Sequence, residues 1–335
     1  MSTETVTPAH GPSVLRILAA LLLLFVPPVA LAVTPFAPAA ELFFVGVIPA
    51  LVGLLHGRRF ALGATFVTAG VVAMVLVANP YRDLSVVLMV AIGLLVGASA
   101  LRGWQTIATV ICSWPAVLLV GVPLSVPGFG WASVLPGSAL LGVAAALAGG
   151  LWTVLIGYLL LRRLPTSPLV PLPAISAVVY GIALALLLGA TTLVATTWGH
   201  GTMAGWVLLT ILVIARPGFT ETWRRVLARS LGTVLGGAAA ALLALAVHTE
   251  WVLATVGFVA LALAILLQLI KADYALYSVA LTAAVVLINS RTTDLFAIDV
   301  ERVGFTVIGA IVTALLLVSL QSVLRRHVPT AGLRR

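Results

Sequence analysis

The sequence predicts an all-α integral membrane protein with about 12 transmembrane helices. Of its 335 residues, 62% are hydrophobic and only 8% are charged, and the mean hydropathy is +1.24. A water-soluble domain carries about 25% charged residues, so this composition is typical of a chain embedded in lipid. Most apolar runs approach the roughly 20 residues that cross about 30 Å of hydrocarbon. Basic residues stand singly or in pairs between these runs, so the net charge of +9 indicates membrane topology and argues against nucleic-acid binding.

The apolar runs follow one another with short polar connections. In the first half the predicted spans cover residues 14–33, 42–56, 60–78, 84–101, 104–122 and 136–161. In the second half they cover residues 172–195, 204–216, 226–247, 251–270, 274–290 and 303–324. Pro27 and Pro28 are expected to kink the first span. Residues 1–13 are polar and predict a disordered tail, and residues 327–335 form a short C-terminal tail.

The two halves of the chain look like copies of one another. Aligning Gly63 with Gly232 and Trp104 with Tyr274 keeps every span paired, and both sixth spans end in Leu-Arg-Arg. Residues 166–173, which include three prolines, form the predicted linker. We therefore predict two six-helix repeats, at residues 14–165 and 166–326. Because six is even, both repeats have the same orientation and are related by an axis along the membrane normal.

The distribution of basic residues predicts the orientation. Three of the 18 Lys and Arg residues, Arg82, Arg291 and Arg302, fall on one side of the predicted membrane, and the other 15 fall on the opposite side. Positive charge marks the cytoplasmic side, so both termini are predicted to be cytoplasmic. The predicted location is the plasma (inner) membrane of a bacterium, where the spans contact the lipid bilayer.

One stretch of the second half, residues 206–236, carries the most distinctive pattern. It holds a short apolar run that ends near Pro217, a basic segment at residues 224–229 that we expect to form a turn, and then a glycine-spaced helix. Gly232 and Gly236 lie four residues apart, on one helix face, where small residues let a neighbouring helix approach closely.

Three segments together carry a family resemblance. They are Trp206, Thr210, Pro217, Arg229, Gly232, Thr233 and Gly236; Tyr274 and Thr282 in YALYSVALT; and Arg302, Thr306, Gly309 and Ala310. In this order they resemble the signature of the fusaric acid resistance (FUSC)-like family of bacterial membrane proteins, which includes aromatic acid exporters. The first half lacks the Trp, Thr and Arg positions, where Phe44, Ile48 and Phe60 stand instead. The first repeat is therefore degenerate, and any site is expected in the second.

The second and eighth spans occupy corresponding places in the two halves, and both look short or interrupted. Pro49 lies inside one, and the other ends at Arg216-Pro217. Broken helices free backbone groups at membrane depth and mark substrate sites in many transporters. The alternative is an ordinary helix end with a proline stop.

The resemblance to exporters implies a path for an aromatic carboxylate. An arginine binds a carboxylate through two hydrogen bonds, and an aromatic face packs against its ring. The candidate path residues are Trp206, Thr210, Pro217, Arg229, Thr233, Tyr274, Thr282, Arg302 and Thr306, and the candidate helix-packing residues are Gly232, Gly236 and Gly309.

Each candidate has a structural alternative. Arg229 can serve only to mark the cytoplasmic side, and Arg302 can pair with Glu301 or Asp299. Threonine hydroxyls commonly bond to a carbonyl of their own helix. Asp273 is a candidate proton carrier, and its alternative is an ion pair with Lys271 at the membrane surface.

Three functions compete. The first is an exporter of small aromatic or amphipathic organic acids, driven by the proton gradient or the membrane potential. The second is a membrane enzyme, which we do not expect, because the external acids come with no recognisable sugar- or metal-binding pattern. The third is an accessory or scaffold subunit of a cell-envelope complex, with partner proteins or as a homo-oligomer. No Walker motif, cofactor site or metal-ligand spacing is present in the sequence.

Overall fold

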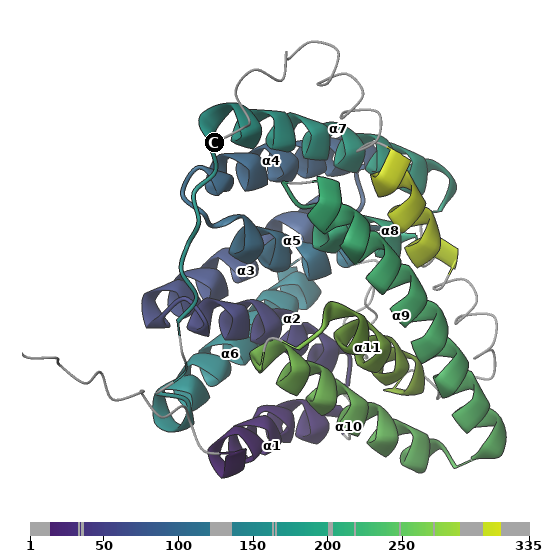
Figure 1. Cartoon of the computed structure of the whole chain (residues 1–335). Coiled ribbons are helices and arrows are strands. Elements are labelled where there is room, and N and C mark those ends of the chain that lie inside the picture. The colour runs from purple at the N-terminus through teal and green to yellow at the C-terminus, as the bar shows by residue number, and fades with distance from the viewer. Residues whose placement is uncertain are drawn as a thin grey trace, which may run out of the picture. The chain divides into compact units, whose positions relative to one another are not determined.

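The computed structural model describes the helices of the chain and the connections next to them (Figure 1). The described residues are 14–32, 34, 37–120, 136–162, 164, 166–199, 204–217, 219–247, 249–270, 272–288 and 304–315. They form twelve helices and no strand, which confirms the all-α class. The predicted tails 1–13 and 327–335, Arg302, and the end of the last predicted span lie outside the described residues.

The helix bounds follow the apolar runs. The helices are α1 (Val14–Ala32), α2 (Ala37–Leu54), α3 (Arg58–Ala78), α4 (Arg82–Ala100), α5 (Gln105–Val120), α6 (Pro136–Leu160), α7 (Ala174–Trp198), α8 (Gly205–Ile214), α9 (Phe219–Ala246), α10 (Glu250–Leu269), α11 (Tyr274–Ile288) and a last helix, Gly304–Leu315. Six of them are long and apolar enough to cross a membrane, and the other apolar helices among the described residues are shorter. The chain is thus a multi-pass membrane protein.

Two expected features are wrong. Helix α9 begins at Phe219 and not at residue 226, so the basic segment is helical rather than a turn. Arginine has high helix propensity, and its long stem lets a helical side chain reach water, so a cluster of arginines need not end a helix. Helix α2 is 18 residues long and runs through Pro49 without interruption. Of the second and eighth spans, α8 is the short one: it has 10 residues and ends at Ile214, as expected before Pro217.

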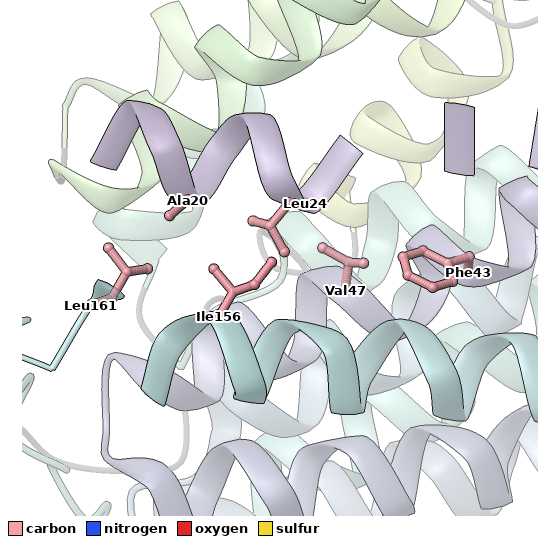
Figure 2. Packing of buried hydrophobic residues seen from close by; sticks show 6 residues of the cluster. All are labelled: Ala20, Leu24, Phe43, Val47, Ile156 and Leu161. Atoms are coloured by element: carbon pink, nitrogen blue, oxygen red, sulfur yellow. The ribbon is translucent and has the colours of Figure 1, made fainter. Parts of the chain in front are cut away.

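The chain divides into two compact units. The first comprises residues 1–73 and 125–169, which include α1, α2, most of α3, and α6. Its core is a cluster of apolar side chains from α1, α2 and the end of α6 (Figure 2). The buried members are Ala20, Leu24, Phe43, Val47, Ile156 and Leu161.

Helices α1 and α2 contact α6 at points where the sequence leaves room for a backbone. Proline 27 has no N–H to bond the carbonyl of Leu23, and the indole Nε1 of Trp152 donates a hydrogen bond of 2.9 Å to that oxygen. Helix α2 crosses α6 at Gly46 and Gly149, where a Cβ atom at either glycine would collide with the backbone of the facing helix. Helix α1 runs through both Pro27 and Pro28.

The second unit comprises residues 74–124 and 170–335. Helix α4 packs along α7, with Gly93 and Gly97 facing the α7 backbone. Helix α8 packs against α5, and α11 packs against both α9 and α10 (Figure 1). Helices α4 and α5 thus share a unit with the helices of the second half, although they belong to the first half in the predicted repeat. The repeat boundary after residue 165 stays a prediction.

Candidate functional site

The connection between α8 and α9 is held by side chains from two neighbouring helices. Residues 215–217 are not helical. The Tyr180 hydroxyl of α7 donates to the carbonyl of Ala215 at 3.2 Å. The Thr222 hydroxyl of α9 accepts from the Arg216 backbone N–H and donates to the Arg216 carbonyl, both at 3.0 Å. Backbone groups freed by the end of α8 therefore have side-chain partners, as buried polar groups require.

A stripe of buried residues runs along α9 from this connection. It begins with Thr222 and continues through Val226, Arg229, Thr233 and Gly236, at the three- and four-residue spacing of one helix face. Val226 packs against Ile214 of α8 and Ala310 of the last helix. Arg229 therefore lies on the covered face of α9, whereas Arg224 is exposed.

The buried guanidinium of Arg229 is the outstanding feature of this stripe. Arg229 is only 1% exposed, and its Nε and Nη1 atoms have no hydrogen-bond partner among the described residues. A charge in such a place costs several kcal/mol unless an opposite charge or hydrogen-bond acceptor compensates it. The expected alternative, a solvated arginine that only marks the cytoplasmic side, does not fit this burial.

Hydroxyl groups without partners accompany Arg229 on α8, α9 and α11. They belong to Thr210, Thr233, Tyr274 and Thr282, and none has a hydrogen-bond partner within the described part of the chain. Eight threonines elsewhere in the described helices form the usual intrahelical bond, to the carbonyl four residues earlier. These are Thr65, Thr68, Thr153, Thr192, Thr196, Thr197, Thr255 and Thr313. The expectation of intrahelical bonding is therefore wrong for Thr210, Thr233 and Thr282.

The glycines expected at helix contacts lie at helix contacts. A Cβ atom at Gly232 would lie 2.6 Å from Cβ of Ser278 on α11, and one at Gly236 would collide with the carbonyl of Val279. The Ser278 hydroxyl also donates to the Arg229 carbonyl at 3.4 Å, which ties α11 to α9 beside the buried charge. A Cβ at Gly309 would lie 3.0 Å from Cβ of Thr210, so the last helix crosses α8 at a candidate path residue.

The remaining candidates divide between buried and exposed positions. Trp206 is buried in α8 and meets the ring of Trp114 edge-on, with 5.6 Å between ring centroids. Thr306 is buried in the last helix, and Pro217 is half-buried after α8. Asp273 is exposed, and its Oδ1 accepts a 2.7 Å hydrogen bond from the N–H of Ala275 at the start of α11. This contact is typical of a helix cap rather than of a proton carrier.

The sequence pattern did not single out Arg216 as a site residue. It is 7% exposed, and its Nη1 donates to the hydroxyl of Thr106 in α5 at 3.2 Å. Its position directly before Pro217, at the end of a ten-residue apolar helix, was the available signal. The sequence predicts only a cytoplasmic charge at this position, because hydropathy does not show which helices cover an arginine.

This group of side chains can hold an anion. Arg229 supplies N–H donors, and the hydroxyls of the threonines and Tyr274 can donate to an oxyanion or accept from a ligand hydroxyl. Within the described residues, no three His, Cys, Asp or Glu side chains are grouped so as to hold a metal ion.

Comparison with known proteins bears on the same residues. The model of the family described as fusaric acid resistance protein-like matches residues 189–316, from α7 to the end of the last described helix. No curated protein and no solved structure matches the chain. The match covers the three motif segments from which the resemblance was inferred. The second half of this membrane protein therefore contains a segment that is similar to the fusaric acid resistance protein-like family.

Proposed function

We propose that the chain is an inner-membrane transporter that exports small aromatic or amphipathic organic acids. The observation that carries this proposal is the buried Arg229: its Nε and Nη1 have no partner among the described residues, and the same is true of buried hydroxyls on α8, α9 and α11. A cation held in a protein interior at this cost is explained by a ligand that neutralises it. A carboxylate offers that charge, and the rings of Trp206 or Tyr274 would suit an aromatic substituent.

In this transporter, Arg229 draws the anion from the cytoplasm and Arg302 receives it nearer the outside. Glycine contacts at Gly232, Gly236 and Gly309 let the helices slide past one another at little steric cost. The exposed capping position of Asp273 favours the membrane potential over a proton carried by that residue. We assign the chain no catalytic role.

The test is accumulation of a panel of labelled aromatic acids in cells that lack the protein or carry one of its variants. We expect the deletion strain and Arg229→Gln to accumulate more acid than wild type at equal protein levels, with Arg302→Gln between them. Glutamine keeps much of the stem and removes the charge. Arg224→Gln is the matched control, because it removes an exposed charge from the same helix. Equal accumulation in all strains across the panel would reject export and favour an accessory subunit of an envelope complex.

We also propose that spans one to six and seven to twelve form two repeats of the same orientation, with both termini in the cytoplasm. A pair of matching contacts supports the repeat: α2 crosses α6 at glycines, and α8 crosses the last helix at Gly309. These are the second and sixth spans of each half. Reporter fusions after Arg163 and after Arg335 should report cytoplasm, and one after His200 should report the outside. A periplasmic signal at Arg163 would contradict the two-repeat topology.

A further inference from the structure

Two arginines of the first unit converge on one tyrosine. The guanidinium carbon of Arg58, in the first turn of α3, lies 4.7 Å from the centroid of the Tyr158 ring on α6. The guanidinium carbon of Arg162 lies 4.5 Å from the same centroid. The two cations are therefore no farther apart than the sum of these distances, and the shared ring holds both by cation–π attraction.

The cations remain accessible although their stems are held. Arg162 donates from Nε to the carbonyl of Tyr158, which fixes its stem against the end of α6. Arg58, Arg59 and Arg162 are exposed, and Tyr158 is 45% exposed. Two exposed guanidinium groups held at one ring offer several N–H donors to an anion with several oxygens, of which a phosphate is the usual example.

Exposed apolar side chains lead away from the arginines along both helices. On α6 they are Leu155 and Leu159, which share a helix face with Tyr158 and Arg162. On α3 they are Leu62 and Phe66, one and two turns beyond Arg58. Helix α3 touches α6 at Thr65, close to where a Cβ atom of Gly150 would lie. Two apolar faces that end together at a cluster of cations match the shape of a phospholipid: acyl chains beside the helices and a phosphate at their ends.

We propose that Arg58, Arg162 and Tyr158 bind the phosphate of an anionic phospholipid whose acyl chains lie along the exposed apolar residues of α3 and α6. Arg59 adds positive charge at the rim of this site. The site lies within the first unit, and it does not depend on the transport proposal. A headgroup bound here fixes the ends of α3 and α6 together at the membrane surface.

The test uses the full-length protein in detergent, with thermal unfolding followed during titration with phosphatidylglycerol, phosphatidylcholine or inorganic phosphate. We expect phosphatidylglycerol to raise the midpoint at lower concentration than phosphatidylcholine, and inorganic phosphate to leave it unchanged. The double variant Arg58→Gln/Arg162→Gln should need about 30-fold more phosphatidylglycerol for half the shift, at about fivefold for each arginine near the headgroup. Arg102→Gln is the matched control, because Arg102 is exposed and stacks on a single ring, that of Trp104.

Each other result overturns a definite part of the proposal. An unchanged half-point in the double variant would remove the arginines from the site. Equal shifts of the thermal midpoint with both lipids would reject headgroup recognition and leave only acyl-chain binding. An equal shift with inorganic phosphate would reject lipid binding and leave a site for a free anion. If the double variant does not fold, the test uses the wild-type protein alone. The phosphatidylglycerol concentration needed for half the shift must then rise steeply with sodium chloride, because salt screens an exposed headgroup contact. A concentration that does not change with salt would reject the proposed headgroup site.

Discussion

Helices α3 and α9 are paired in the predicted repeat, and buried polar side chains on the two helices differ in their hydrogen bonding. In α3, the hydroxyls of the buried Thr65 and Thr68 bond the carbonyls of Ala61 and Ala64, at 2.9 and 2.7 Å. In α9, neither the hydroxyl of Thr233 nor two nitrogens of Arg229 have a partner among the described residues.

The two helices differ in whether their own backbone supplies hydrogen-bond partners for their buried polar side chains. Phe60 stands in α3 where the alignment places Arg229 in α9, and its ring meets that of His56 edge-on rather than presenting a charge. The hydroxyls of Thr65 and Thr68 are satisfied within α3 and stabilise it, whereas Thr233 and Arg229 of α9 reduce stability unless a ligand is present. Buried polar groups without partners among the described residues, as on α9, are typical of a binding site.

The largest effect is expected at Arg229. Replacing it with Met removes a buried charge whose Nε and Nη1 have no partner among the described residues, and keeps an apolar chain of similar length, so the free energy of unfolding should rise by about 1–4 kcal/mol. Binding of an aromatic acid should weaken about tenfold or more, because a hydrogen bond to a charged group is lost. Chemical unfolding and equilibrium binding of the purified protein measure the two changes.

Arg59→Met is the control from α3, where the side chain is exposed and little change is expected. A large loss of stability in Arg229→Met would show that Arg229 is structural, and would remove the main contrast between α3 and α9.

The next effect concerns glycine packing. Gly236→Leu should destabilise the protein by about 1–3 kcal/mol or more, because even its Cβ collides with the backbone of α11. Gly63→Leu in α3 should be tolerated, since nothing lies within 4 Å of a Cβ at that position. The yield of monodisperse protein and its thermal midpoint compare the two variants. Equal behaviour would mean that α9 and α11 are not packed closely.

A smaller effect separates the threonines. Thr65→Val breaks an intrahelical hydrogen bond and should lower the free energy of unfolding by about 1 kcal/mol. Thr233→Val replaces a buried hydroxyl that has no partner within the described residues, so it should leave stability unchanged or raise it by up to about 1 kcal/mol. Denaturant titration of both variants in detergent gives the comparison. A loss at Thr233 as large as at Thr65 would argue for a bonded hydroxyl.

The smallest effect tests whether α11 also carries a buried hydroxyl without a hydrogen-bond partner. Tyr274→Phe removes a buried hydroxyl without a partner among the described residues and should be neutral in the absence of ligand. Tyr180→Phe removes the bond to the Ala215 carbonyl and should cost about 1 kcal/mol. The thermal unfolding midpoints of the two variants measure these effects. A lower midpoint in Tyr274→Phe but not in Tyr180→Phe would show that the Tyr274 hydroxyl is the one with a stabilising bond.

Hydropathy was enough to predict the number and order of the helices and most of their ends. Twenty apolar residues form a helix in lipid because every backbone group must be bonded within the segment, so hydropathy alone locates it. The end of α8 before Pro217 and the motif segments of the second half were determined in the same local way. Glycine spacing also indicated correctly which face of α9 another helix covers.

Tertiary structure alone decided which polar groups are covered and which are satisfied. Arg224 and Arg229 are one residue type on one helix, and only the packing of the neighbouring helices makes one exposed and the other buried. The start of α9 at Phe219 and the grouping of α4 and α5 with later helices were likewise absent from the hydropathy pattern. Burial and hydrogen bonding depend on contacts between residues far apart in the chain, and the apolar content of a single segment carries no information about its partners.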